Sequence, residues 1–197
     1  MAADMEAIKA RAAAFYDFAG KAVLHVGAGG GQLVDAARGA ARITAIDVDE
    51  AAVRRLADAA RAKGLDGRLE ARVADFMSWD EAADVVLLEF CLHEMPDPAA
   101  ALRKARSLAP DVVVIDHDAG SPWAAFTGEA EKVASGGAAL DAARPRRSET
   151  AVVPQAFASR EELAKKIAVL GAEALARAAA LPPGPISFAM PFRLALL

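Results

Sequence analysis

A run of apolar residues that ends abruptly in glycines constrains the fold of this chain more than any other stretch. Residues 23–26 are followed by Gly27, Gly29 and Gly31, after which a helical pattern resumes. The apolar run suits a buried strand, and glycine allows positive φ and a close approach of the backbone to a bound group. A helix that begins there presents unpaired N–H groups to the turn, which suits a polar or anionic ligand. The sequence therefore predicts a strand, a nucleotide-type loop and a helix over residues 31–38.

The spacing of the glycines separates two nucleotide-binding patterns. A dinucleotide fingerprint is G-x-G-x-x-G/A, and its last position falls on Gln32, which breaks that pattern. The G-x-G-x-G that stands here resembles the first motif of the class I S-adenosylmethionine (SAM)-dependent methyltransferases, which implies that Gly27, Gly29 and Gly31 bind the cofactor. That family has an acidic residue two places before the first glycine, near the methionine end of the ligand, where this chain has His25. A turn that only closes a strand-helix corner is the alternative.

Composition restricts the functions that such a fold can serve. The formal net charge of −4 argues against nucleic acid as a partner, because non-specific binding needs a broad basic surface. No apolar run approaches the ~18 residues of a membrane-spanning helix, and the acidic N-terminus is unlike a signal peptide. The 197 residues fit one domain, residues 1–197, which we expect to be cytoplasmic and a monomer or homodimer. The single Cys91 excludes an internal disulfide and a cysteine metal cluster.

An acidic residue at the end of the second predicted strand is a candidate cofactor ligand. Asp47 follows Gly27 by 20 residues, a distance at which a carboxylate can accept both ribose hydroxyls of a nucleoside. Its two oxygens match two vicinal donors, and the adjacent Val48 is expected at the same site. Asp47 could instead cap the next helix, but Asp49 can fill that role and leave Asp47 for the ribose.

The third predicted strand, residues 68–73, leads to a second acidic candidate. Asp75 and Phe76 stand just after it and resemble the family's pair of an aspartate and an aromatic residue. The resemblance implies that the carboxylate takes the adenine amino group while the neighbour flanks the ring. Aspartate is also common in ordinary turns, which is the alternative for Asp75.

A nearly continuous apolar run, residues 84–90, is typical of a central parallel strand covered on both faces. The segment Leu92-His93-Glu94 that follows resembles the Leu-His-His segment of many small-molecule methyltransferases. By that resemblance, Glu89 and Phe90 line the methionine half of the cofactor and His93 faces the substrate. His93 is thus a candidate general base, with a structural histidine as the alternative.

Three more residues are candidates for the substrate side. His117 follows the fifth predicted strand, at the sheet edge where ligands bind; no metal is expected there, because the three histidines share no i,i+4 pair. Trp123 lies in residues 120–154, expected as an irregular insertion over the site that sets substrate choice. Tyr16 belongs to an amphipathic helix within residues 1–20 that resembles the family's lid helix, with simple packing as the alternative.

The order of these elements predicts a Rossmann-like α/β fold with a seven-stranded, mostly parallel sheet and helices on both faces. Residues 174–181 and 186–197 are expected as an antiparallel pair of strands, which gives the sheet a reversed last strand. The resemblance implies transfer of a methyl group from SAM to a small-molecule acceptor. The alternatives are a SAM-binding protein without turnover, which His25 keeps open, and an NAD(P)-dependent oxidoreductase.

Overall fold

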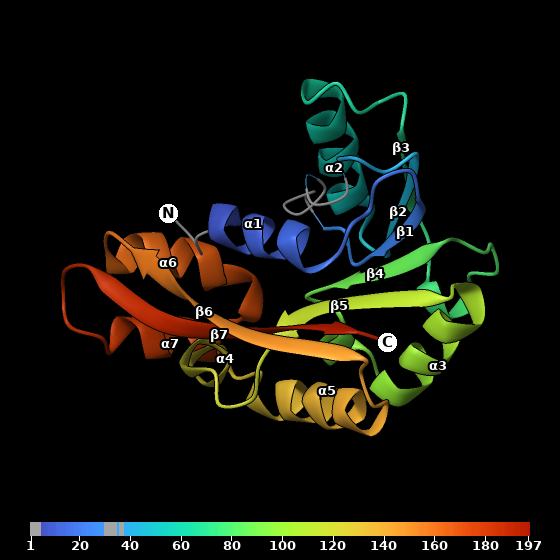
Figure 1. The fold of residues 1–197 in the computed structure, drawn as a ribbon. Coiled ribbons are helices and arrows are strands. Elements are labelled where there is room, and N and C mark those ends of the chain that lie inside the picture. Colours follow the sequence, from blue (N-terminus) through green and yellow to red (C-terminus); the bar gives the residue numbers. More distant parts are fainter. Residues whose placement is uncertain (1–4, 30–34, 36–37) are drawn as a thin grey trace.

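The strands of the computed structural model, which describes residues 5–29, 35 and 38–197, form one sheet in the order β3-β2-β1-β4-β5-β7-β6 (Figure 1). They are β1 (Ala22–Val26), β2 (Arg42–Asp47), β3 (Leu69–Val73), β4 (Val85–Glu89), β5 (Asp111–His117), β6 (Arg147–Phe157) and β7 (Ile186–Leu196). Strands β1 to β5 pair in parallel, and β7 runs antiparallel to β5 and β6. The predicted fold class and the reversed last strand are confirmed.

Helices cover both faces of this sheet (Figure 1). They are α1 (Met5–Phe15), α2 (Glu50–Ala62), α3 (Pro98–Leu108), α4 (Pro122–Thr127), α5 (Ala130–Ala142), α6 (Arg160–Ile167) and α7 (Ala172–Ala179), with the short 3-10 turns η2 (Phe76–Ser78), η3 (Leu92–Glu94) and η4 (Ala168–Leu170). One core cluster joins the sheet to α1, α2, α4, α6 and α7, and a second joins its other face to α3 and α5. The site must therefore lie at a sheet edge, since both faces are covered.

Strand β4 shows why the sequence pattern located the parallel strands. All five of its residues are buried, with Val85 and Leu87 in one core cluster and Val86 and Leu88 in the other. Side chains of a strand alternate between its faces, so a strand covered on both sides is apolar throughout. Helix α2 begins after Asp49, whose carboxylate accepts a hydrogen bond from the Ala51 N–H, as predicted.

The predicted hairpin at the C-terminus is wrong in its first strand. Residues 174–181 lie mainly in helix α7, and the antiparallel partner of β7 is β6. Alanine favours the helix over the strand, and the buried Ala174 and Ala178 stand four residues apart on one helix face. The sequence analysis read residues 174–181 as extended because prolines tie them to β7.

The segment 120–154 is also more regular than expected, because it contains α4, α5 and most of β6. From residue 150 to 157, β6 alternates exposed and buried positions, which is the period-2 pattern of a strand with one covered face. The predicted helix over residues 31–38 lies almost wholly outside the described residues. Within the described part of the chain, no helix is both long and apolar enough to cross a bilayer.

Candidate functional site

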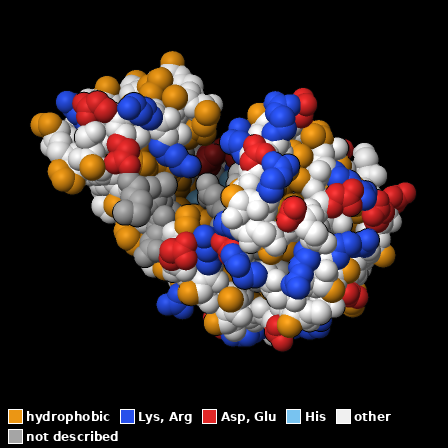
Figure 2. All heavy atoms as spheres, turned by 90° about the horizontal axis from the view of Figure 1, so that it is seen from above, with side chains coloured by type: hydrophobic (Ala, Val, Ile, Leu, Met, Phe, Trp, Pro, Cys, Tyr) orange, Lys and Arg blue, Asp and Glu red, His pale blue; other side chains and the backbone are white. Residues whose placement is uncertain are grey.

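A cavity of about 380 Å³ lies where the carboxyl ends of β1, β2 and β4 meet. This is the sheet edge at which open α/β folds bind ligands. Figure 2 shows the surface hollowed between two lobes, with acidic side chains at the hollow. The cavity is lined by Val26, Gly27, Ile46, Asp47, Val48, Ala74, Asp75, Phe76, Phe90, Cys91, Glu94, Met95 and Pro96. The structure thus brings Gly27, Asp47, Val48, Asp75, Phe76 and Phe90, all predicted from sequence, around one space.

The glycine loop approaches the turn after β4 so closely that no side chain fits at its first position. A Cβ on Gly27 would lie 2.4 Å from Cys91 Cβ and 2.7 Å from its Sγ. Gly27 also has φ +68° and Gly29 has φ +49°, a region that favours glycine. Burial raises the pKa of the Cys91 thiol, so it stays neutral while Sγ lies 3.4 Å from the Val26 carbonyl oxygen. Gly31 lies outside the described residues.

The carboxylate of Asp47 organises the loop and still has acceptor sites left. Its Oδ2 accepts a hydrogen bond from Gly29 N–H at 2.9 Å, and Oδ1 accepts one from Asp49 N–H at the same distance. A carboxylate offers about four acceptor sites, so about two remain. Asp47 can therefore hold the loop and bind a diol at the cavity together.

The turn after β3 supplies a second carboxylate and an apolar wall. Asp75 caps η2 by accepting a hydrogen bond from Met77 N–H at 3.0 Å, so the alternative turn role is real. The residue is exposed and lines the cavity. Phe76 is 3% exposed, and Val48 on the facing strand end is 72% exposed. Apolar groups on both sides with a carboxylate at the edge suit a flat heterocycle that bears an amino group.

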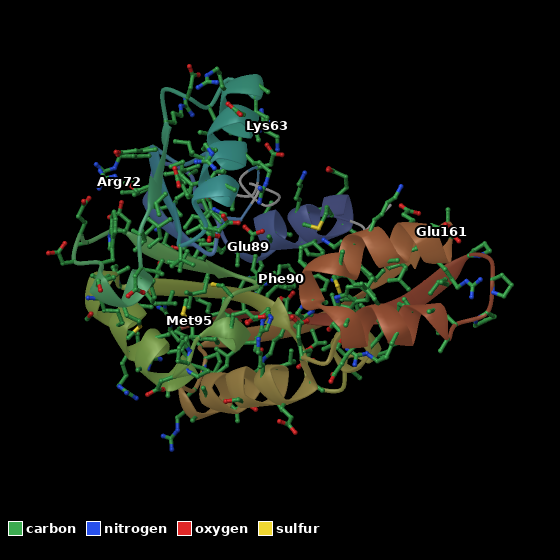
Figure 3. The ribbon with its side chains drawn as sticks, turned by 180° about the vertical axis from the view of Figure 1, so that it is seen from behind. Lys63, Arg72, Glu89, Phe90, Met95 and Glu161 are labelled. Atoms are coloured by element: carbon green, nitrogen blue, oxygen red, sulfur yellow. The ribbon has the colours of Figure 1, made fainter. Side chains whose placement is uncertain are left out.

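His25 is placed differently from a residue that contacts a ligand directly. It is wholly buried in β1, does not line the cavity, and its Nε2 lies within ion-pairing distance of Glu89 Oε2. Neither atom has a well-directed hydrogen bond within the described part of the chain. Glu89 is also buried and stands at the end of β4, next to Phe90 (Figure 3). His25 and Glu89 therefore pair in the interior, and Glu89 itself does not line the cavity, although the adjacent Phe90 does.

The turn after β4 is strained at the cavity wall. Phe90 has φ +44°, a conformation that few residues with a large side chain adopt. Its N–H donates a hydrogen bond to the Ile115 carbonyl oxygen at 2.7 Å, and its ring centroid lies 5.0 Å from that of His117. Figure 3 shows Phe90 above Met95, which lines the same cavity. The strained residue is therefore one that lines the cavity.

Two histidines lie together beyond this turn, at the end of β5. The rings of His93 and His117 meet edge to face with centroids 5.2 Å apart. His93 Nδ1 lies 2.5 Å from Asp116 Oδ1, and its backbone N–H donates to Oδ2 at 3.0 Å. Burial disfavours the charged imidazolium, but the Asp116 carboxylate outweighs it and raises the pKa of His93. Burial lowers the pKa of His117 to about 4, so this ring is neutral near pH 7.

Two predicted substrate-side residues lie elsewhere. The Tyr16 hydroxyl donates to Asp111 Oδ2 at 2.5 Å, at the first residue of β5 and so at the opposite sheet edge from the cavity. Trp123 is 6% exposed and stacks on Phe157 with centroids 5.7 Å apart. The expectation that these two rings face the substrate is wrong. Trp123 belongs to the core and the partly buried Tyr16 packs against it, which is the alternative weighed for the aromatic residues of the first helix.

The cavity also contains residues that the motifs did not identify. Glu94 ends η3 and Met95 follows it, and both line the cavity, as does Cys91 just before η3. The signal in the sequence was only their position just after the central strand, since ligands bind beyond strand carboxyl ends. The acidic and apolar wall that they add extends the cavity towards His93.

Comparisons with known proteins agree with this geometry. Residues 24–115 match the profile of the methyltransferase domain family. Among solved structures, a candidate methyltransferase from Bacillus halodurans superposes with a TM-score of 0.70 at 18% identity, covering 96% of this chain and 97% of its own. The cyclase SpnF gives 0.59 at 23% identity, with 95% and 80% covered. The magnesium protoporphyrin IX methyltransferase of Synechocystis, solved with S-adenosylhomocysteine, gives 0.58 at 12%, with 97% and 81% covered.

The sheet order with its reversed β7 and the cavity at the carboxyl ends of the parallel strands define a methyltransferase-type α/β domain. From β1 to β5 the chain matches the methyltransferase domain family, and its fold is that of the class I SAM-dependent methyltransferases. No protein of curated function matches the chain in sequence. The antiparallel β7 also separates this sheet from the all-parallel dinucleotide sheet of the oxidoreductase alternative.

Proposed function

We propose that this chain transfers the methyl group of SAM to a small-molecule acceptor. The observation that carries the proposal is the single cavity walled by Gly27, Asp47 and Asp75 at three neighbouring turns. The two remaining acceptor sites of Asp47 suit the two ribose hydroxyls. The Asp75 carboxylate suits the adenine amino group, with Val48 and Phe76 along the ring.

The methionine half would extend from the glycine loop towards Glu89 and Phe90. Because a side chain at position 27 would collide with Cys91, only backbone atoms of the loop can face the ligand at this point. The Glu89 carboxylate is the group on this side that suits the ammonium of the ligand, and His25 positions it from below. The cavity therefore suits a ligand with a diol and an amino-bearing ring, and contact of its ammonium group with Glu89 is the part of this proposal that needs the buried carboxylate to reach the cavity.

When bound, SAM supplies a methyl group already activated on a sulfonium. The acceptor atom donates an electron pair to the methyl carbon as the carbon–sulfur bond breaks, which leaves S-adenosylhomocysteine. The protein contributes mainly by aligning the two molecules and excluding water. If the acceptor atom bears a proton, the imidazole of His93 is the candidate to accept it, at Nε2.

A small molecule is the acceptor that the surface supports. The net charge of −4 and the acidic Glu94 at the cavity wall disfavour a polyanionic acceptor such as RNA. The Synechocystis neighbour acts on magnesium protoporphyrin IX, which is a small molecule. The cyclase SpnF has the same fold, so the fold alone does not decide the reaction.

Calorimetric titration with SAM, S-adenosylhomocysteine and NAD tests the cofactor. We expect binding of the first two and none of NAD. Asp47→Asn should weaken SAM binding about 10- to 100-fold, since a hydrogen bond to a charged group is worth about 1.5–3 kcal/mol. Asp58→Asn, on the exposed side of α2, is the matched control and should leave the affinity unchanged. NAD binding without SAM binding would refute the proposal.

Transfer itself is tested with SAM labelled in its methyl group, incubated with the protein and separate fractions of small molecules, RNA and protein. We expect label in the small-molecule fraction. Label in RNA or protein alone would refute the acceptor class. Tight SAM binding with no label transferred in any fraction would favour the alternative of a SAM-binding protein without turnover.

A further inference from the structure

A buried histidine and two carboxylates meet beside the cavity. His93, Glu94 and Glu129 each place a ligand atom within 4.8 Å of the other two. His93 and Glu94 belong to η3, whereas Glu129 directly precedes α5. We call these three residues the His-Glu-Glu cluster. The sequence analysis expected no metal, because it looked for histidine pairs within one helix, and this cluster joins two elements.

The ring of His93 is fixed with one nitrogen directed at the carboxylates. Asp116 Oδ1 lies 2.5 Å from Nδ1 of His93, and Asp116 Oδ2 accepts a hydrogen bond from the His93 backbone N–H at 3.0 Å. With the Nδ1 proton on this hydrogen bond, Nε2 carries a lone pair. The side chain is 5% exposed, and Nε2 lies 3.5 Å from Glu94 Oε1, which is long for a hydrogen bond. A carboxylate that orients a histidine in this way is typical of metal ligands.

The distance between His93 and Glu94 matches that between two ligands of one metal ion. Nε2 of His93 lies 3.5 Å from Oε1 of Glu94. Two ligand atoms bound at about 2.1 Å with tetrahedral angles are separated by about 3.4 Å. Glu129 is oriented by Thr127, whose hydroxyl donates to Oε2 at 2.7 Å. The ligand atom of Glu129 lies within 4.8 Å of the other two, so an adjustment of its side chain would bring all three onto one ion.

Packing holds the two elements of the cluster in place. A Cβ on Gly136 of α5 would lie 3.2 Å from the Cα of His93, so glycine permits a close contact between α5 and η3. The Nζ of Lys132, also on α5, binds Glu94 Oε2 at 2.6 Å and leaves Oε1 towards His93. The site is thus built by tertiary packing and does not depend on one exposed loop.

The charge balance of the cluster favours a divalent cation. Three carboxylates, Asp116, Glu94 and Glu129, lie around the ring of His93, and Lys132 supplies one positive charge. A histidine that binds a metal ion is neutral, so in that state the sum of these charges is about −2. One divalent ion would neutralise it.

We propose that the His-Glu-Glu cluster binds one divalent transition-metal ion, such as Zn²⁺ or Mn²⁺. One imidazole with two carboxylates suits these ions, whereas Mg²⁺ prefers oxygen ligands alone. Because Glu94 also lines the cavity, the ion lies at the cavity edge. Contact of the ion with an acceptor oxygen rests on the proposed function, but binding of the ion does not.

Metal binding is measured on the full chain, stripped with a chelator, by calorimetry with Zn²⁺, Mn²⁺ and Mg²⁺. We expect one equivalent of Zn²⁺ or Mn²⁺ and much weaker binding of Mg²⁺. Glu129→Gln and Glu94→Gln should each weaken binding at least 10-fold, and Asp116→Asn should weaken it about 10- to 100-fold. Glu131→Gln is the matched control, because this exposed carboxylate stands two residues from Glu129 on α5 and outside the cluster.

Substitution with Co²⁺ gives a readout that does not need activity. We expect visible absorption bands of a site with nitrogen and oxygen ligands, lost in Glu129→Gln and kept in Glu131→Gln. No binding by the wild-type chain, or binding that none of the cluster variants weakens, would overturn the proposal. Metal binding without methyl transfer would support the metal site and count against the proposed function. SAM-dependent transfer by the stripped protein would support the proposed function and show that it does not need the metal.

Discussion

Gly27→Ala tests whether the crowded contact between the glycine loop and the turn after β4 builds the cavity. The new Cβ would stand 2.4 Å from Cys91 Cβ and 3.1 Å from the Glu89 carbonyl oxygen. Neither atom is the end of a flexible side chain, so backbone must move. Overpacking of this kind costs about 1–3 kcal/mol, and alanine at positive φ adds about 1–2 kcal/mol. We expect unfolding free energy to fall by about 2–5 kcal/mol.

Gly20→Ala separates the two contributions. Gly20 has φ +72°, close to the +68° of Gly27, but a Cβ there would meet nothing within 4 Å. It should lose only the about 1–2 kcal/mol of the backbone conformation. The difference between the two variants, about 1–3 kcal/mol, is then the steric contact with Cys91.

Urea unfolding of both variants, followed by circular dichroism, gives the free energies. The double variant Gly27→Ala/Cys91→Gly lacks the two Cys91 atoms at 2.4 and 2.7 Å. Its unfolding free energy should lie below that of Cys91→Gly only by about the loss measured for Gly20→Ala. SAM affinity should fall in Gly27→Ala and stay unchanged in Gly20→Ala. Equal losses of stability in Gly27→Ala and Gly20→Ala would refute the reasoning.

Three further predictions concern residues away from the cofactor contacts. Tyr16→Phe should lower unfolding free energy by about 1 kcal/mol in urea unfolding and leave SAM affinity unchanged; a weaker SAM complex would place the ring at the cleft after all. Trp123→Ala should lower it by about 3–5 kcal/mol, and a loss below about 1 kcal/mol would contradict its core position. Burial lowers the pKa of His117 from 6.5 to about 4, so between these pH values the unfolded chain binds more protons than the folded chain. The unfolding free energy should therefore fall by up to about 3 kcal/mol as the pH drops from 6.5 to about 4. Comparison with His117→Gln by unfolding at several pH values checks this, and equal pH dependence of the two proteins would contradict it.

The parts of the fold that could be predicted from the sequence are those fixed by local pattern. The buried run of β4 requires cover on both faces, so it indicates a central parallel strand before any tertiary contact is known. Asp47 and Asp75 stand just beyond strands, and parallel strands end at a common edge, so their place at the cavity follows from the strand assignments. The parallel strands and the sheet edge that carries the cavity could therefore be predicted from the sequence.

The parts that could not be predicted depend on contacts between distant segments. Residues 174–181 are rich in alanine, so their apolar pattern distinguishes helix from strand only weakly. The sequence analysis predicted a strand because the segment lies close to β7 along the chain, although alanine favours a helix. Tyr16 is an aromatic residue in the segment predicted as a lid helix, and only the direction of α1 across the sheet places it beside Asp111. Glu129 reaches His93 through the packing of Gly136 on η3, and no spacing along the chain encodes that contact.

His25 shows how a departure from a motif can be balanced elsewhere in the fold. Taken alone, it removes the family's acidic residue and suggests a weaker cofactor site. In the structure its ring lies against the carboxylate of Glu89, the last residue of the neighbouring strand β4, so the end of β4 supplies the carboxylate that position 25 lacks. An aspartate at position 25 would place a second buried carboxylate against Glu89, and like charges at low dielectric repel strongly. Residue 25 therefore supports the carboxylate on β4, and restoring the family residue there would require a change at residue 89 as well.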